Sequence, residues 1–331
     1  MKRLMSLLLL SILLIFPNIS SHAEETVNAP EVIIDTDFAS DADDVVALEL
    51  AMCYQDLGLI DVKGVALSTT YSRSPAAVKA VLSQGRYGYI PVAMSTSNTV
   101  QVHTEYVNSI YEYGYNNYVD PVKLYRRILA ESTGKVNIIT LGFLQNIEDL
   151  INSGADQYSY LSGSELIKEK VDTLYIVGGN LDGRPSFNFY WGDGRSTTDA
   201  AQYVNNNFPA RIVYFTEEMG NDVFCGGFYA KEDNRENNII TKALKSNKQE
   251  YGVVAWDPFA VFCMVQDMYD VLDQYNIELR NGSAYISHTG SFSWTDFGEV
   301  YSGRQIFIKN RYGGDYNQYL NGMLYTKFKT E

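Results

Sequence analysis

Short apolar runs alternate with helix-like segments over most of the chain. The apolar runs predict buried strands at residues 32–34, 59–67, 89–94, 136–141, 171–177 and 211–215. Helices are predicted at residues 45–52, 74–83, 121–131, 142–150 and 259–268. From residue 276 to 307 apolar and polar residues alternate, which is typical of antiparallel strands. This order predicts an α/β fold with a mainly parallel open sheet of Rossmann-like type, helices on both faces, and small antiparallel C-terminal strands.

Two polar stretches interrupt the pattern. Residues 95–118 are polar and aromatic, and we expect a loop-like lid or insertion there. Residues 231–250 are highly polar, and we expect a solvated helix and loop. The sequence holds no internal repeat.

The N-terminus has the features of a secretory signal peptide. Lys2 and Arg3 form a basic start, residues 7–16 form an apolar core, and Ser-His-Ala at 21–23 is a plausible cleavage site. A retained membrane anchor is the alternative. No later stretch is apolar enough to span a membrane. We therefore expect a signal peptide at residues 1–23 and a single domain at residues 24–331, free of the membrane and either secreted or periplasmic.

The charge balance excludes one class of partner. Forty acidic residues stand against 26 basic ones, for a net charge of −14. A nucleic-acid-binding protein needs a basic surface, so we expect no nucleic-acid partner. The three cysteines, Cys53, Cys225 and Cys263, lie in apolar surroundings and cannot all pair, which favours buried thiols.

Five aspartates crowd into ten residues, Asp35-Thr-Asp-Phe-Ala-Ser-Asp-Ala-Asp-Asp44, between a predicted strand and a predicted helix. The carboxyl end of a strand is where ligands bind in open α/β sheets. Neighbouring carboxylates destabilise one another unless something neutralises them. A helix N-terminus carries roughly half a positive charge and settles only one or two of them. A divalent cation with oxygen ligands, Ca²⁺ or Mg²⁺, is the natural remaining partner. The alternative is a solvated acidic loop with one helix cap.

This turn resembles the signature of the nucleoside hydrolase family, which includes inosine–uridine-preferring enzymes. That family opens with a strand leading into Asp-x-Asp and closes the turn with Asp-Asp before a helix, and this chain carries a longer form of it. Further segments resemble the family in the same order along the chain: Gly142-Phe-Leu-Gln-Asn146, Phe187-Asn188, Thr216-Glu-Glu-Met-Gly220 and Trp256-Asp257-Pro258.

The resemblance implies Ca²⁺-dependent hydrolysis of the N-glycosidic bond of ribonucleosides, giving ribose and free base. By the same resemblance, the metal ligands would be Asp37, Asp44, Asp257 and the carbonyl of Leu141. Asp37 would also take a proton from the attacking water. On residue types alone, an Asp before a Pro that starts a helix favours a helix N-cap for Asp257.

The resemblance also implies contacts to the substrate. Asp43 would bind a ribose hydroxyl, and Asn188 would hold the terminal hydroxyl of the sugar. Asp35 would be a supporting carboxylate that orients the site, and Asp41 receives no role. The family often has Glu two residues before its Asn, where this chain has Ser186.

The leaving group marks the largest departure. Nonspecific members of the family carry His directly before the last calcium Asp, and this chain has Trp256 there. Of the histidines beyond the signal peptide, neither His103 nor His288 lies in a motif. A Trp resembles the purine-preferring branch, in which an aromatic side chain stacks on the base, so we expect purine nucleosides to be preferred. The alternative reading of Trp256 is a core aromatic residue.

Two other functions stay open on the same fold. The departures favour a non-catalytic protein that binds a nucleoside or a sugar, and a hydrolase of a different N-riboside is also compatible. Retention of Asp37, Asp44 and Asp257 together favours the enzyme. We expect a small-molecule nucleoside as partner, a role in nucleoside salvage, and a homo-oligomer as a possibility known from the family.

Overall fold

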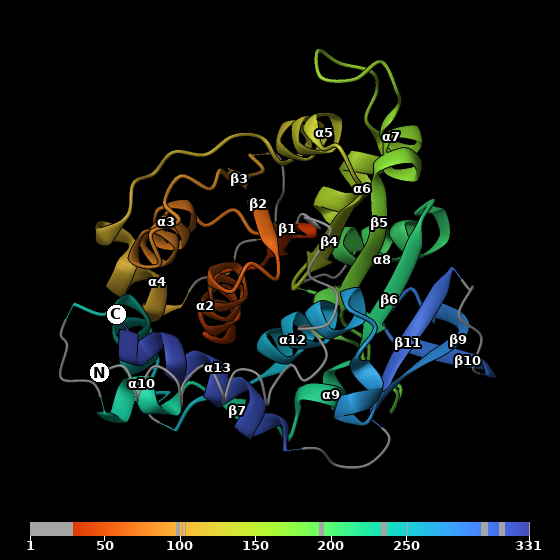
Figure 1. Ribbon diagram of the computed structural model, residues 1–331. Coiled ribbons are helices and arrows are strands. Elements are labelled where there is room, and N and C mark those ends of the chain that lie inside the picture. The colour runs from red at the N-terminus through yellow and green to blue at the C-terminus, as the bar shows by residue number, and fades with distance from the viewer. Residues whose placement is uncertain are drawn as a thin grey trace, which may run out of the picture.

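A nine-stranded sheet forms the centre of the molecule (Figure 1). The computed structural model describes residues 29–96, 100, 102, 104–191, 195–232, 237–249, 251–298, 304–310 and 315–330. The strands of the large sheet are, in spatial order, β10 (Phe292–Gly298), β9 (Ile277–Ile286), β11 (Gln305–Asn310), β6 (Arg211–Phe215), β5 (Val171–Val177), β4 (Val136–Thr140), β1 (Glu31–Thr36), β2 (Asp61–Leu67) and β3 (Val92–Met94). The predicted signal peptide lies outside the described residues.

The sheet is mainly parallel, as predicted. Strands β3, β2, β1, β4, β5, β6 and β11 run in parallel, and β9 is antiparallel to both β11 and β10. The spatial order of the first six strands, 3-2-1-4-5-6, is that of a doubly wound dinucleotide-binding sheet. The order reverses between β1 and β4, and ligands bind at the carboxyl ends of such strands.

Helices cover both faces of the sheet, because alternate side chains of each strand point to opposite sides. In β1, Val32 and Ile34 join one buried cluster and Ile33 joins the other. One face is covered by α2 (Asp43–Asp56), α3 (Ser74–Gln84), α4 (Glu105–Ile110), α10 (Gly227–Glu232), α11 (Ile239–Ser246), α12 (Trp256–Met268) and α13 (Tyr316–Thr330). The other is covered by α5 (Pro121–Glu131), α6 (Gln145–Asn152), α7 (Gly163–Lys170) and α8 (Arg195–Asn207).

Helices α2 and α12 lie in the interior and pack against each other (Figure 1). Both are apolar around most of their circumference, which is typical of a buried helix. The backbone N–H of Asp257 donates to the carboxylate of Asp43 at 3.1 Å, so the N-terminal turns of the two helices meet. Two helix N-termini thus lie at the carboxyl end of β1.

The C-terminal third adds elements that the sequence pattern did not predict. The predicted antiparallel strands are present as β9 and β10, and they extend the large sheet through β11. A separate small sheet pairs β7 (Phe224–Cys225) with β8 (Val253–Val254) in antiparallel fashion. Helix α13 follows β11 and packs against α2. Short 3₁₀ helices lie at Tyr111–Tyr113, Phe187–Phe189 and Leu272–Tyr275.

The expected lid at residues 95–118 is wrong, and the stretch at 231–250 contains the expected helix but not a solvated one. The proposed lid at residues 95–118 contains α4, whose Tyr106, Val107 and Ile110 are buried in the core. The stretch at 231–250 contains α11, which buries Ile239 and Leu244, because its few apolar residues fall on one helical face. The three cysteines are buried free thiols, as predicted. Within the described ranges, no helix is long and apolar enough to cross a membrane.

Gly142, directly after Leu141, is in close contact with the acidic turn. A Cβ atom at this position would lie 2.4 Å from the Cβ of Asp37 and 2.7 Å from its backbone nitrogen. We predict that Gly142→Ala destabilises the protein by about 1–3 kcal/mol, because Asp37 must move away. Denaturant unfolding would measure this. The control is Gly134→Ala, where nothing lies within 4 Å of the added Cβ. Equal stability of the two variants would contradict the contact.

Candidate metal centre and ligand pocket

The acidic turn joins β1 to α2 through a strained backbone. Ala39 is fully buried and has φ +111°, a conformation that residues with a side chain rarely adopt. Its N–H donates to the hydroxyl of Tyr106 on α4 at 2.5 Å. Side chains that follow β2 hold the preceding carbonyl, since Thr69 and Ser74 both donate to the Phe38 oxygen, at 3.2 and 2.9 Å. The turn is therefore held from two neighbouring segments.

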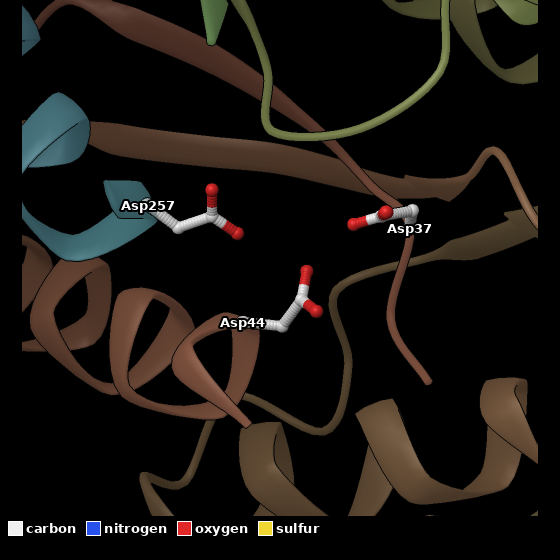
Figure 2. Close-up of side chains that lie close together, drawn as sticks. All are labelled: Asp37, Asp44 and Asp257. Atoms are coloured by element: carbon white, nitrogen blue, oxygen red, sulfur yellow. The ribbon is translucent and has the colours of Figure 1, made fainter. Parts of the chain in front are cut away.

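Three carboxylates meet beside this turn. Each of Asp37, Asp44 and Asp257 contributes an oxygen, and these oxygens all lie within 4.8 Å of one another. Figure 2 shows the side chains turned toward one another from the end of β1, the start of α2 and the start of α12. All three side chains are buried. The fold thus joins residues that are more than 200 positions apart in the sequence into one cluster.

The cluster carries acidic charge that the surrounding chain does not balance. Burial first, and the carboxylates of Asp41 and Asp35 after it, raise the pKa of Asp37 to about 7, although hydrogen bonds to this carboxylate lower it. Burial first, and neighbouring carboxylates second, hold the pKa of Asp44 and of Asp257 well above the ordinary value. Asp37 Oδ2 is buried without a hydrogen-bond donor within the described part of the chain. These oxygens fit a hard divalent cation such as Ca²⁺.

Neighbouring side chains orient the cluster. Thr36 Oγ1 donates to Asp44 Oδ1, and Ser40 Oγ lies 3.5 Å from Asp44 Oδ2. The N-cap interpretation of Asp257 is wrong, because α12 begins at Trp256 and the Asp257 side chain makes no capping hydrogen bond. Asp43 binds the free N–H of this helix end instead. The carboxylate of Asp257 is therefore left to face the cluster.

Besides Asp43, two other aspartates of the turn, Asp35 and Asp41, lie outside the cluster. Asp35 is fully buried and accepts hydrogen bonds from Tyr125 on α5 and, at 3.0 Å, from Asn146 on α6. Burial raises the pKa of Asp35 to about 7 despite these bonds. Asp41 lies at the pocket surface and accepts from the N–H of Ala42 at 2.6 Å. Asp35 thus supports the turn from behind, through Tyr125, which no sequence pattern indicated, and Asn146, which ends the family-like segment Gly142–Asn146.

A cavity of about 290 Å³ opens beside the cluster, at the carboxyl ends of the central strands. Its lining residues are Asp37, Ser40, Asp41, Asp43, Leu141, Val177, Phe187, Asn188, Glu217, Trp256 and Asp257. Of the residues that the sequence predicted for the site, the lining lacks Asp44, which lies at the cluster itself. The structure therefore brings all the predicted site residues to one place, and it leaves their individual roles to experiment.

Asn188 ties two strand ends together. Its amide group donates to the carbonyls of Leu141 at 2.9 Å and Val177 at 3.0 Å. The Leu141 carbonyl, the predicted metal ligand, keeps a second lone pair. Trp256 is half-buried, lines the cavity, and donates through its indole N–H to Asn221 at 2.9 Å. It is a wall of the pocket and not a core aromatic residue.

Five lining residues received no role from the sequence: Ser40, Asp41, Val177, Phe187 and Glu217. Phe187 precedes Asn188, and Glu217 begins the short helix α9 (Glu217–Gly220) at the end of β6. The available signal was the segment Thr216-Glu-Glu-Met-Gly220, although the Glu of its Glu-x-Gly pattern is Glu218 and Glu217 directly precedes it. His288 is exposed in the turn between β9 and β10 and does not line the cavity, and His103 lies outside the described residues.

Comparisons with known proteins support the predicted fold. No family model matches the sequence, and no curated protein matches it. Among solved structures, the inosine-uridine preferring nucleoside hydrolase from Bacillus anthracis is similar, with a TM-score of 0.65 and 15% sequence identity over 91% of this chain and 100% of that chain. An inosine-guanosine nucleoside hydrolase has a TM-score of 0.64 and 15% identity over 89% and 97%.

A third similar structure is the purine-preferring ribonucleoside hydrolase from Gardnerella vaginalis, with a TM-score of 0.61 and 14% identity over 89% of this chain and 96% of that chain. Each match extends over nearly all of both chains. This chain has the nucleoside hydrolase-like fold.

Proposed function

We propose that this protein is a Ca²⁺-dependent hydrolase that cleaves ribonucleosides to ribose and free base. The observation that carries the proposal is the cluster of Asp37, Asp44 and Asp257, whose oxygens lie within 4.8 Å beside a cavity of about 290 Å³. The similar solved structures are nucleoside hydrolases, which supports the same reaction class. Cleavage of an N-glycosidic bond needs a positioned water, a grip on the sugar and a stabilised leaving base.

Different residues would position the water and bind the sugar. Asp37, Asp44, Asp257 and the Leu141 carbonyl would hold the ion. A bound Ca²⁺ would supply a site for water and for sugar hydroxyls, and would lower the pKa of that water. Asp37 Oδ2 has no donor among the described residues, so it is free to accept the proton of the attacking water. The carboxylate of Asp43 lines the cavity and would accept from a ribose hydroxyl.

The leaving base would lie against Trp256. The indole is held by Asn221 and by the close approach of Gly220, where an added Cβ would lie 2.7 Å from Trp256 Cδ1. A fixed aromatic wall suits a flat base, and the extended rings of purines gain more from stacking than pyrimidines do. This supports purine nucleosides as the preferred substrates. The N-terminal sequence supports a secreted or periplasmic location, and hence salvage of external nucleosides.

A binding protein without turnover is the second candidate. The observation that favours it is the lining of the cavity, in which the described residues include no His to protonate the leaving base. Such a protein would keep the ion and the nucleoside and release no ribose.

Ribose release is the direct test. We expect the mature protein to release ribose from purine nucleosides in Ca²⁺ and to lose this activity in a chelator. Asp37→Asn should reduce kcat by at least about a hundredfold, because a metal ligand and a proton acceptor are lost together. The control is Asp270→Asn, an exposed position beyond the far end of α12, which should retain activity. Ca²⁺-dependent nucleoside binding without any ribose release would favour the binding protein.

The buried carboxylates predict an unusual pH dependence of stability. Because the pKa of Asp37 is raised from 3.8 to about 7, the folded metal-free protein binds more protons than the unfolded chain across that window. Its stability should therefore fall as the pH rises from about 4 to 7. Thermal unfolding in a chelator would measure the fall, and Asp44→Asn should reduce it. Stability that rises with pH over the same range would contradict this assignment.

Ca²⁺ should restore the stability that the metal-free protein loses as the pH rises. At a concentration one hundred times its Kd, a ligand specific to the folded state stabilises by about 2.7 kcal/mol. We expect Ca²⁺ to raise Tm most at neutral pH, where the carboxylates are ionised, and little near pH 4. Asp257→Asn should abolish this increase, whereas Asp270→Asn should retain it. An equal effect of Ca²⁺ on both variants would place the ion elsewhere.

Substitution of Trp256 tests the predicted preference for purine bases. If the indole stacks on the base, Trp256→Ala should cost about 1–3 kcal/mol of transition-state stabilisation with purine nucleosides and less with pyrimidine nucleosides. Steady-state kcat/KM for inosine and uridine would show the difference. A similar loss for both would assign Trp256 a structural role only.

A further inference from the structure

Glu217 is a carboxylate in the cavity that lies outside the aspartate cluster. It follows β6, whereas the cluster comes from the ends of β1 and the starts of α2 and α12. Its N–H donates to the Gly179 carbonyl at 3.0 Å, which ties the start of α9 to the segment after β5. The nearby α12 reinforces this position, because Gly220 packs directly against Trp256. The backbone of Glu217 is therefore fixed on two sides.

Hydrogen bonds also fix the side chain. Glu217 Oε1 accepts from Ser186 Oγ at 2.8 Å and from the Phe187 N–H at 3.3 Å. Within the described ranges, Oε2 makes no hydrogen bond, and it is not buried. One oxygen thus anchors the carboxylate to the cavity wall, and the other remains available to a ligand.

Ser186 is already fully engaged. Its hydroxyl donates to Glu217 and accepts from the Gly179 N–H at 2.9 Å, and the side chain is completely buried. The amide nitrogen of Asn188 is likewise committed to two backbone carbonyls. Asn188 can still accept through its neutral side-chain oxygen, so among the described residues at this end of the cavity the charged acceptor open to a ligand hydroxyl is the carboxylate of Glu217.

We propose that Glu217 determines specificity by accepting a hydrogen bond from the terminal hydroxymethyl group of the substrate's sugar, with Ser186 as its positioning residue. This inference rests on the proposed function. The aspartate cluster would hold the vicinal hydroxyls, so the hydroxymethyl group would lie on the opposite side of the ring, toward Ser186, Asn188 and Glu217. By the family resemblance, a Glu often stands where this chain has Ser186. The carboxylate of Glu217 would supply the charged acceptor that Ser186 lacks.

The same carboxylate would select against phosphorylated substrates. A terminal phosphate would bring a dianion next to Glu217 in a cavity whose described lining includes four aspartates and no basic side chain. The nearby Arg184 is engaged by Asp182 at 2.6 Å and does not line the cavity. Nucleosides with a free terminal hydroxyl, and not nucleotides, are therefore the substrate class that this site fits.

The experiment compares inosine with 5′-deoxyinosine, which lacks only the terminal hydroxyl. Glu217→Gln should lower kcat/KM for inosine by about tenfold or more, since a hydrogen bond to a charged group is lost, and change kcat/KM for 5′-deoxyinosine by less than about twofold. Glu218→Gln is the matched control. Its carboxylate binds the Leu181 N–H at 2.6 Å and does not line the cavity, so both substrates should be unaffected.

Ser186→Ala should reproduce part of the Glu217→Gln effect with inosine and, like it, spare the deoxy analogue. Equal losses for both nucleosides, or no loss for either, would overturn the proposal. If the wild-type protein releases no base, the hydrolase function fails, and the contact is tested by thermal shift. A larger Tm increase with inosine than with 5′-deoxyinosine, lost in Glu217→Gln, would support Glu217, and equal increases would reject it.

Discussion

Repulsion among buried carboxylates is the constraint on which the rest of this structure depends. Two unit charges about 4 Å apart repel by about 4 kcal/mol at the effective dielectric constant of a protein surface, and burial increases this value. The N-termini of α2 and α12 both point toward the cluster and offset part of it, but a helix dipole contributes only about 0.3–2 kcal/mol. Protonation or a cation must supply the remainder. The site is therefore stable only when protons or a cation neutralise part of the carboxylate charge.

The architecture around the cluster is consistent with that constraint. Each carboxylate is held by a different element, and the elements are themselves buried and apolar, so the oxygens cannot move apart without disturbing the core. The strained backbone at Ala39 is fixed by Tyr106 and Phe38, which belong to the same packed region. Behind the turn, Asp35 is held by Tyr125 and Asn146. Stability of the fold is thus coupled to the charge state of the site.

The lining of the cavity is of two chemical kinds. The aspartates and the strand-end carbonyl of Leu141 provide hard oxygen atoms, and Phe187 and Trp256 provide aromatic surface. Phe187 packs against Trp191 with ring centroids 4.7 Å apart, which continues the aromatic surface toward the solvent. A ligand that carries both hydroxyl groups and a flat ring suits such a lining, as the proposed nucleoside substrate does.

Local sequence patterns determined much of this protein. Strands with continuous apolar runs, such as β5 and β6, and the helix that begins after Asp120 were predictable, because burial and capping leave a mark at nearest-neighbour spacing. The density of aspartates at residues 35–44 indicated a cation, because so many like charges at one turn need a counter-charge. The tertiary structure decided the rest. On residue types alone Asp257 looked like a helix cap, and it was the family resemblance that predicted a metal ligand. The packing of α12 against α2 brings Asp257 to Asp37 and Asp44, and Asp43 binds the helix-end N–H instead. Glu217 and Ser186 met for the same reason: hydrogen bonds between distant strand ends carry no periodicity that a sequence can reveal.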